Sequence, residues 1–92
     1  MNNKKKFIDP FTDLLPRIDL HGMDRVYARI KTIEFINDSI KLKRNRIIII
    51  HGKGEGILKE EVYKVLKSNK YVKDYKLDGF NIGQTIVELK NI

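Results

Sequence analysis

Two histidines, each followed by a glycine, are the residues of this sequence whose type and spacing best suit catalysis. His21 precedes Gly22, His51 precedes Gly52, and Asp19 lies two positions before the first histidine. An imidazole titrates close to neutral pH, so it can accept or release a proton during a reaction. In an extended chain, a carboxylate two residues away lies on the same face and can orient the ring. These observations make Asp19, His21 and His51 the candidate catalytic residues.

A glycine-rich loop, His51-Gly52-Lys53-Gly54-Glu55-Gly56, begins at the second histidine. Glycines allow a ligand to approach the backbone closely, and the free amides at the start of a following helix favour phosphate. The loop has neither the Walker spacing nor the dinucleotide-binding Gly-x-Gly-x-x-Gly pattern, which disfavours ATP and NAD. We therefore expect a phosphate-binding set here and beside the first histidine, made of Gly22, Arg25, Gly52, Lys53, Gly54 and Gly56.

A structural role is the alternative for the same residues. Asp19 could cap a turn or pair with Arg17, and each histidine could simply bond to the backbone of its own loop. Glycines are also what a tight turn from a strand into a helix requires. The convergence of two histidines beside one glycine loop favours the functional interpretation.

Two helices are predicted from the spacing of apolar side chains. The first begins after Asp24, whose carboxylate suits an N-cap, and its three- and four-residue steps of apolar residues run through Val26, Ile30, Ile33, Ile36 or Asn37, and Ile40. The second runs from the glycine loop to about Asn69, with Leu58, Val62, Val65 and Leu66 facing inward. Both helices are expected to be amphipathic.

Four strands complete the predicted fold. They are a short strand at 17–20, a β-branched strand at 47–50 that suits cover on both faces, and strands near 72–77 and 85–89 separated by a turn. The order βαβαββ predicts an α/β fold, a two-layer α+β sandwich with a mixed four-stranded sheet. A strand-helix-strand connection implies parallel pairing, so the first two strands end at one edge. This places both histidines at the same rim.

The start of the chain differs from the rest. Met1–Pro16 carries lysines, two prolines and scattered apolar residues, and is predicted to be an extended and partly disordered arm. The remaining residues, 17–92, suffice for one domain with one core. No segment has the length and hydropathy of a signal peptide or a membrane span, and there are no cysteines, so we expect a cytoplasmic monomer without membrane contact.

The charge balance points to a polyanionic partner. The 92 residues carry a net charge of +7, which suits RNA, DNA or a ribosome, although a basic surface can also be merely solvated. Lys43 and Arg44 belong to a second basic cluster, which precedes the central strand whereas His51 follows it. Five strand residues put the cluster roughly 15 Å or more from the histidine. It could hold a long RNA but not the scissile bond, and a solvated loop is the simpler interpretation.

The sequence resembles the Smr (small MutS-related) family in two motifs. The first motif is Ile18-Asp19-Leu20-His21-Gly22, and the second, after one helix and one strand, is the glycine loop with Ile57-Leu58. The resemblance extends over Arg17 to Lys90 and includes the segment Gly83-Gln84-Thr85-Ile86-Val87-Glu88-Leu89, which is similar to the family's final glycine-to-strand segment. Where the family often has a fuller glycine cluster, this chain has Phe80 and Asn81. The resemblance implies DNA-nicking or RNA-cleaving endonuclease activity, and a fold similar to the C-terminal domain of translation initiation factor three.

Two functional hypotheses follow. The first is a phosphodiester endonuclease in which one histidine takes the proton of an RNA 2′-hydroxyl, the other protonates the leaving oxygen, and no metal is strictly required. DNA would instead need an activated water, most plausibly on Mg²⁺ or Mn²⁺ held weakly by Asp19. The second hypothesis is a non-catalytic module that docks on nucleic acid or ribosomes through the same loop and basic faces.

Overall fold

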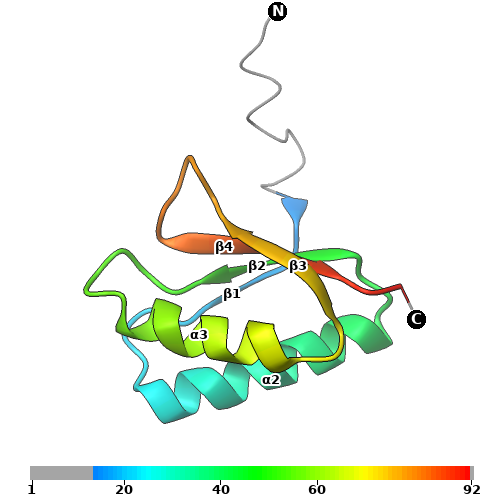
Figure 1. Cartoon of the computed structure of the whole chain (residues 1–92), viewed down its shortest axis with the longest axis horizontal. Coiled ribbons are helices and arrows are strands. Elements are labelled where there is room, and N and C mark those ends of the chain that lie inside the picture. Colours follow the sequence, from blue (N-terminus) through cyan, green and yellow to red (C-terminus); the bar gives the residue numbers. More distant parts are fainter. Residues whose placement is uncertain (1–13, 92) are drawn as a thin grey trace, which may run out of the picture.

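The computed structural model describes residues 14–91, which form two layers, a sheet and a pair of helices on one of its faces (Figure 1). The elements are β1 (Arg17–Asp19), α2 (Arg25–Lys41), β2 (Arg46–Ile50), α3 (Ile57–Ser68), β3 (Val72–Leu77) and β4 (Gln84–Leu89). This is the predicted βαβαββ order. Residues 1–13 of the predicted arm lie outside the described residues, while its last residue, Pro16, accepts a hydrogen bond from the Ile48 amide at 2.9 Å.

The sheet has four strands in the order β1-β2-β4-β3. β1 pairs with β2 in parallel, as the strand-helix-strand connection predicts, and β3 and β4 form the predicted antiparallel hairpin. β4 also inserts beside β2 in antiparallel orientation, which makes the sheet mixed. The β-branched run of β2 is central, and Ile47, Ile48 and Ile49 are fully buried. Both helices cover one face of the sheet, and the complete burial of three successive isoleucines agrees with the predicted cover on both faces of this strand.

α3 supplies the inward side chains that its periodicity predicts. Val62, Val65 and Leu66 are buried against the core, and Leu58 is half-buried at its margin. They pack with Leu20 of the chain after β1 and with alternate residues of the strands. Burial of this apolar surface is the main favourable term that holds the helical layer to the sheet.

The predicted apolar side of α2 is wrong for most of its residues. Val26, Ile30 and Ile33 are 55%, 45% and 38% exposed, and of the predicted residues only Ile36 is fully buried. Apart from Ile36, the buried side chains of this helix are small ones: Ala28, Thr32 and Ser39. Small side chains allow the helix axis to approach its neighbours closely, and the Thr32 hydroxyl donates to the Ala28 carbonyl at 2.7 Å, which satisfies its polarity inside the core. Close packing of this face therefore outweighed the burial of the larger apolar residues.

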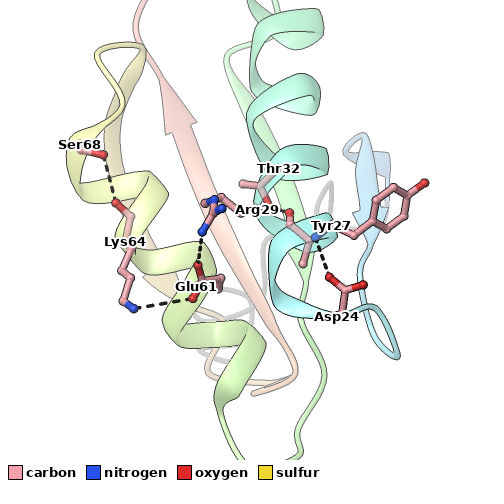
Figure 2. A network of polar contacts seen from close by, with 8 residues as sticks. Asp24, Tyr27, Arg29, Thr32, Glu61, Lys64 and Ser68 are labelled. Carbon is pink, nitrogen blue, oxygen red and sulfur yellow. Dashed lines mark hydrogen bonds and ion pairs between the residues drawn. The ribbon is translucent and has the colours of Figure 1, made fainter.

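Polar contacts cap the N-terminus of α2 and link α2 to α3 (Figure 2). Asp24 accepts the Tyr27 amide at 2.9 Å, as expected for an N-cap. Across the interface, Arg29 Nη1 lies 3.1 Å from the buried Glu61 carboxylate, which Lys64 also approaches at 3.7 Å. Because the Glu61 side chain is only 8% exposed, losing Arg29 would leave the buried negative charge of Glu61 poorly compensated.

No helix in the described part of the chain is long and apolar enough to cross a membrane.

Candidate active site at the sheet edge

The ends of β1 and β2 bring the first histidine against the glycine loop. Asp19 is the register partner of Ile50, and the Leu20 amide continues the ladder with a 2.7 Å bond to the Ile50 carbonyl. A Cβ placed on Gly52 would lie 3.5 Å from the Cβ of His21. The backbone of the glycine loop therefore passes directly beside His21, at the edge where the sequence places them.

Asp19 and His21 form a hydrogen-bonded pair that remains open to solvent. Asp19 Oδ1 accepts from His21 Nδ1 at 2.9 Å and from the His21 amide at 3.1 Å. The two side chains are 53% and 73% exposed. A proton on Nδ1 that is donated to a carboxylate leaves the lone pair on Nε2, the nitrogen that faces away from the aspartate. His21 thus presents an oriented proton acceptor to the solvent.

The hydrogen bonds from His21 also lower the pKa of Asp19 below its usual value, the side-chain bond contributing most and the backbone bond next. Asp19 therefore stays ionised over the range in which an imidazole titrates. A carboxylate in this position fixes the tautomer of the ring and stabilises the imidazolium formed when Nε2 takes a proton. This arrangement is suited to a general base.

His51 lies in the opposite environment. It is only 4% exposed, and both of its ring nitrogens have partners: Nδ1 donates to the Gly52 carbonyl at 3.1 Å, and Nε2 lies 2.9 Å from Thr85 Oγ1. The Tyr63 hydroxyl bonds to the same threonine oxygen at 3.0 Å, and its ring meets the imidazole edge-on. Burial lowers the pKa of His51, so the ring is held neutral. In that form Tyr63 donates to Thr85, and Thr85 donates to Nε2.

Strand register explains why the two imidazoles differ. Asp19 and Ile50 are paired, so the next residues, Leu20 and His51, both turn toward the helical layer. Leu20 is fully buried there, and His51 meets Tyr63 of α3. Asp19 and the histidine paired with it lie on the other face. The two histidines therefore share the predicted edge of the sheet but occupy opposite faces of it, with one buried.

Thr85 and Tyr63 are neighbours of the site to which the sequence analysis assigned no role. Thr85 is the register partner of Ile49 and is fully buried. The alternation of side chains along β4 places Thr85, its second residue, on the core side. A threonine at such a position does not by itself indicate a chemical role. Only the pairing of β2 with β4, which no local pattern encodes, puts its hydroxyl beside His51.

The glycine loop has the backbone of a phosphate site. Gly52 and Gly56 adopt positive φ angles of 89° and 85°, which side-chain-bearing residues rarely adopt. Gly56 is the N-cap of α3 and brings no side chain to the helix start, so the first amides of α3 keep their capacity for an anion. Lys53 is exposed on the loop, and Gly54 has open space around it. Gly22, with φ of 83°, follows His21, and the exposed Arg25 is the first residue of α2.

Lys43 and Arg44 lie at the other end of β2, as the sequence indicates. Lys43 follows the C-terminus of α2 with a left-handed φ of 59°. The guanidinium of Arg44 lies 5.8 Å from the Phe35 ring centroid and donates to Ser39 Oγ at 3.3 Å. Arg44 therefore helps to close the end of its own helix, and the cluster is separate from the histidine edge.

The described part of the chain offers few ligands for a divalent cation. Among residues 14–91, no group of three or more His, Cys, Asp and Glu side chains is placed to hold a metal ion. Asp19 Oδ1 accepts two hydrogen bonds from His21. A weak Mg²⁺ or Mn²⁺ site that uses Asp19 as a single carboxylate ligand stays a prediction.

Comparison with known proteins identifies the family of the chain. A family model described as the Smr domain matches residues 18–90. The chain is 40% identical over 76 residues to the endonuclease MutS2 of Clostridium kluyveri (strain NBRC 12016), covering 79% of this chain and 10% of the relative. It is 37% identical over 83 residues to the endonuclease MutS2 of Clostridium botulinum (strain Eklund 17B / Type B), covering 87% and 11%. The chain therefore spans about a tenth of the length of these relatives.

Two solved structures show the same fold. The Smr domain of Thermus thermophilus MutS2 superposes with a TM-score of 0.78 at 24% identity, covering 83% of this chain and 99% of that one. YdaL, a stand-alone small MutS-related protein from Escherichia coli, gives 0.73 at 24% identity, covering 80% and 63%. These matches confirm the predicted βαβαββ fold with a mixed four-stranded sheet and two helices as the fold of Smr domains.

Proposed function

The chain belongs to the Smr domain family, and from this we propose that it is an endonuclease that cleaves phosphodiester bonds of RNA at the edge formed by β1, β2 and the glycine loop. The observation that carries the proposal is the exposed Asp19–His21 pair beside Gly52. Homology to proteins named endonuclease MutS2 supports a nuclease. RNA suits these residues because its own 2′-hydroxyl can act as the nucleophile.

His21 is the general base of the proposed reaction. Its Nε2 takes the proton of the 2′-hydroxyl while the 2′-oxygen bonds to phosphorus, and Asp19 stabilises the resulting imidazolium. The bond between phosphorus and the 5′-oxygen then breaks, and this oxygen takes a proton from water. The products are a 2′,3′-cyclic phosphate and a 5′-hydroxyl end. His51, whose nitrogens are both engaged, supports the loop instead of exchanging protons with substrate.

The glycine loop would bind the reacting phosphate. The amides at the start of α3 and the Lys53 ammonium supply positive charge where the phosphorane becomes more negative. Gly52 carries no side chain beside His21, which leaves room there for a phosphate to approach the backbone. Lys53 and His21 would thus act on the same phosphate from neighbouring segments.

The proposal is tested with one RNA in three forms: unmodified, 2′-O-methylated throughout, and as the DNA of the same sequence. We expect cleavage of the unmodified RNA alone, unchanged by EDTA, with cyclic phosphate ends detected by mass spectrometry. Cleavage of the methylated RNA or of DNA, lost in EDTA, would instead mean attack by a metal-activated water and would contradict this mechanism.

A docking module without catalysis is the second candidate, and the burial of His51 favours it, because only one of the two histidines is then exposed to a ligand. Such a module would bind nucleic acid or a ribosome through Lys53 and the basic surface. It predicts binding that weakens steeply with salt and on charge reversal at Lys53 or Arg44, with no product strand at any protein concentration.

A further inference from the structure

The loop between β3 and β4, residues 78–83, is joined to the glycine loop by hydrogen bonds. The Gly83 carbonyl accepts from the amides of both His51 and Gly52 at 2.9 Å. A Cβ on Gly83 would lie 3.2 Å from Lys53 Cγ and 3.5 Å from the Gly52 carbonyl carbon. In Figure 1 this loop and the glycine loop lie at the same end of the sheet. Whatever phosphate Lys53 binds therefore lies close to the β3–β4 loop.

The β3–β4 loop is held rigidly from inside. Asp78 Oδ1 accepts the Phe80 amide at 2.9 Å, and its Oδ2 accepts from Gln84 Nε2 at 2.8 Å. Asn81 Oδ1 accepts the Gly83 amide at 3.0 Å. Asp78 and Gln84 are 9% and 5% exposed, so this network is largely closed to water. The loop presents its outer side chains in a preorganised arrangement, which reduces the entropy cost of binding.

Two large apolar side chains are left in solvent on this rigid loop. Phe80 is 63% exposed and Ile82 is 56% exposed. Gly83 is the third residue after Phe80, so their Cα atoms are at most about 11 Å apart. Because Gly83 contacts the glycine loop and Lys53, an aromatic ring on this loop matches the combination by which proteins bind unpaired nucleic acid, in which charges follow the backbone and rings stack on bases.

We propose that Phe80 is a stacking residue for an unpaired nucleobase next to the phosphate held by the glycine loop, with Ile82 flanking the base. The ligand class is single-stranded nucleic acid or a loop of structured RNA, since a base inside a duplex is already stacked and has no free face. This inference rests on the proposed function, because it needs the glycine loop to bind a nucleic-acid phosphate. It adds that the domain selects unpaired over paired substrate.

Phe80→Trp provides a direct test because the chain has no tryptophan. The variant is mixed with a hexamer of RNA and with an abasic oligomer of the same length, and its emission is followed during titration. We expect quenching by the base-bearing oligomer and little by the abasic one. Ile33→Trp is the matched control, because Ile33 is another exposed apolar residue but lies in the middle of α2. Its emission should not change.

Affinity measurements complete the test. Phe80→Ala should weaken binding of the single-stranded hexamer about fivefold or more, leave the abasic oligomer unaffected, and be rescued in Phe80→Tyr. Two results would overturn the stacking role without overturning the proposed function. The first is that Phe80→Ala binds the hexamer as tightly as the parent does. The second is that Phe80→Trp binds both oligomers with the same emission, whether or not the oligomer carries bases. If the parent protein binds none of these oligomers, the proposed function fails and the stacking role fails with it.

Discussion

His21 and His51 follow neighbouring parallel strands and both precede a glycine, yet their rings meet opposite surroundings. His21 is 73% exposed with a carboxylate on one nitrogen, whereas His51 is 4% exposed with a partner on each nitrogen. The difference arises because register pairs Asp19 with Ile50, which offsets the two histidines by one residue. In a strand, an offset of one residue moves a side chain to the other face.

The contrast teaches that two identical dipeptides can divide one task. One ring is available to a substrate, and the other fixes the loop that would receive it, through Gly52 on one side and Thr85 on the other. Substitutions and pH changes that separate these two roles differ in the size of their expected effects.

The largest effect is expected for His21→Ala. Removing the general base should lower the rate of RNA cleavage by about 10²- to 10⁴-fold, the usual contribution of such a group. The melting temperature should stay within about a degree or two of the parent, because the side chain is largely exposed. Single-turnover cleavage and thermal unfolding measure the two quantities. Full cleavage by this variant would remove His21 from the mechanism.

His51→Ala should act mainly on stability. It leaves the Gly52 carbonyl and the Thr85 hydroxyl without their buried partner, so we expect the free energy of unfolding to fall by up to about 3 kcal/mol. Denaturant unfolding measures the loss. Where the variant remains folded, its cleavage rate should exceed that of His21→Ala. A stable variant with no activity would show that His51 exchanges protons with substrate after all.

Thr85→Val should have a smaller effect of the same kind. It removes the hydroxyl shared by His51 and Tyr63 and should cost about 1 to 2 kcal/mol in unfolding free energy. Thr32→Val is the matched control: Thr32 is also fully buried, but its hydroxyl bonds only to a carbonyl one helical turn earlier. Its loss should be nearly neutral. Equal losses in the two variants would mean that the His51 network adds nothing beyond burial.

The smallest effect is the dependence of stability on pH. The folded-state pKa of His51 is lowered, chiefly by burial, so below 6.5 the unfolded chain binds a proton that the folded chain resists. Stability from this group is therefore complete above pH 6.5 and is lost as pH falls through the folded-state pKa. Unfolding followed at a series of pH values should show the decline, and His51→Gln should abolish it.

Asp19 gives the corresponding pH effect for the exposed site, in a different window. Its pKa is lowered by the hydrogen bonds from His21, so its contribution is complete above the ordinary value of 3.8 and is lost as pH falls through the folded-state pKa. Solvent screening keeps it weak. A decline below pH 6.5 that persisted in His51→Gln would assign the pH effect to another group.

Much of the fold could be predicted from the sequence because it depends on local patterns. The N-cap at Asp24, the buried β-branched strand, the hairpin and the apolar side of α3 all follow from residue type and spacing. α2 was the exception. Its isoleucines repeat at helical spacing, but the tight packing of Ala28 and Thr32 against the core decided which side faces inward. Periodicity identifies a helix, whereas the shape of its neighbours sets its rotation.

By itself the sequence determined the order of elements and the edge at which Asp19, His21 and the glycine loop meet, because each depends on spacing along one or two segments. It placed Asp19 and His21 on one face, and the structure showed that they are hydrogen-bonded. Only the tertiary structure decided that His51 is buried. That result requires the register of β1 on β2, the placement of β4 beside β2, and the approach of Tyr63 from α3. These contacts join residues distant in sequence, and a shift of β2 by one residue against its neighbours would have turned the imidazole to the other face of the sheet.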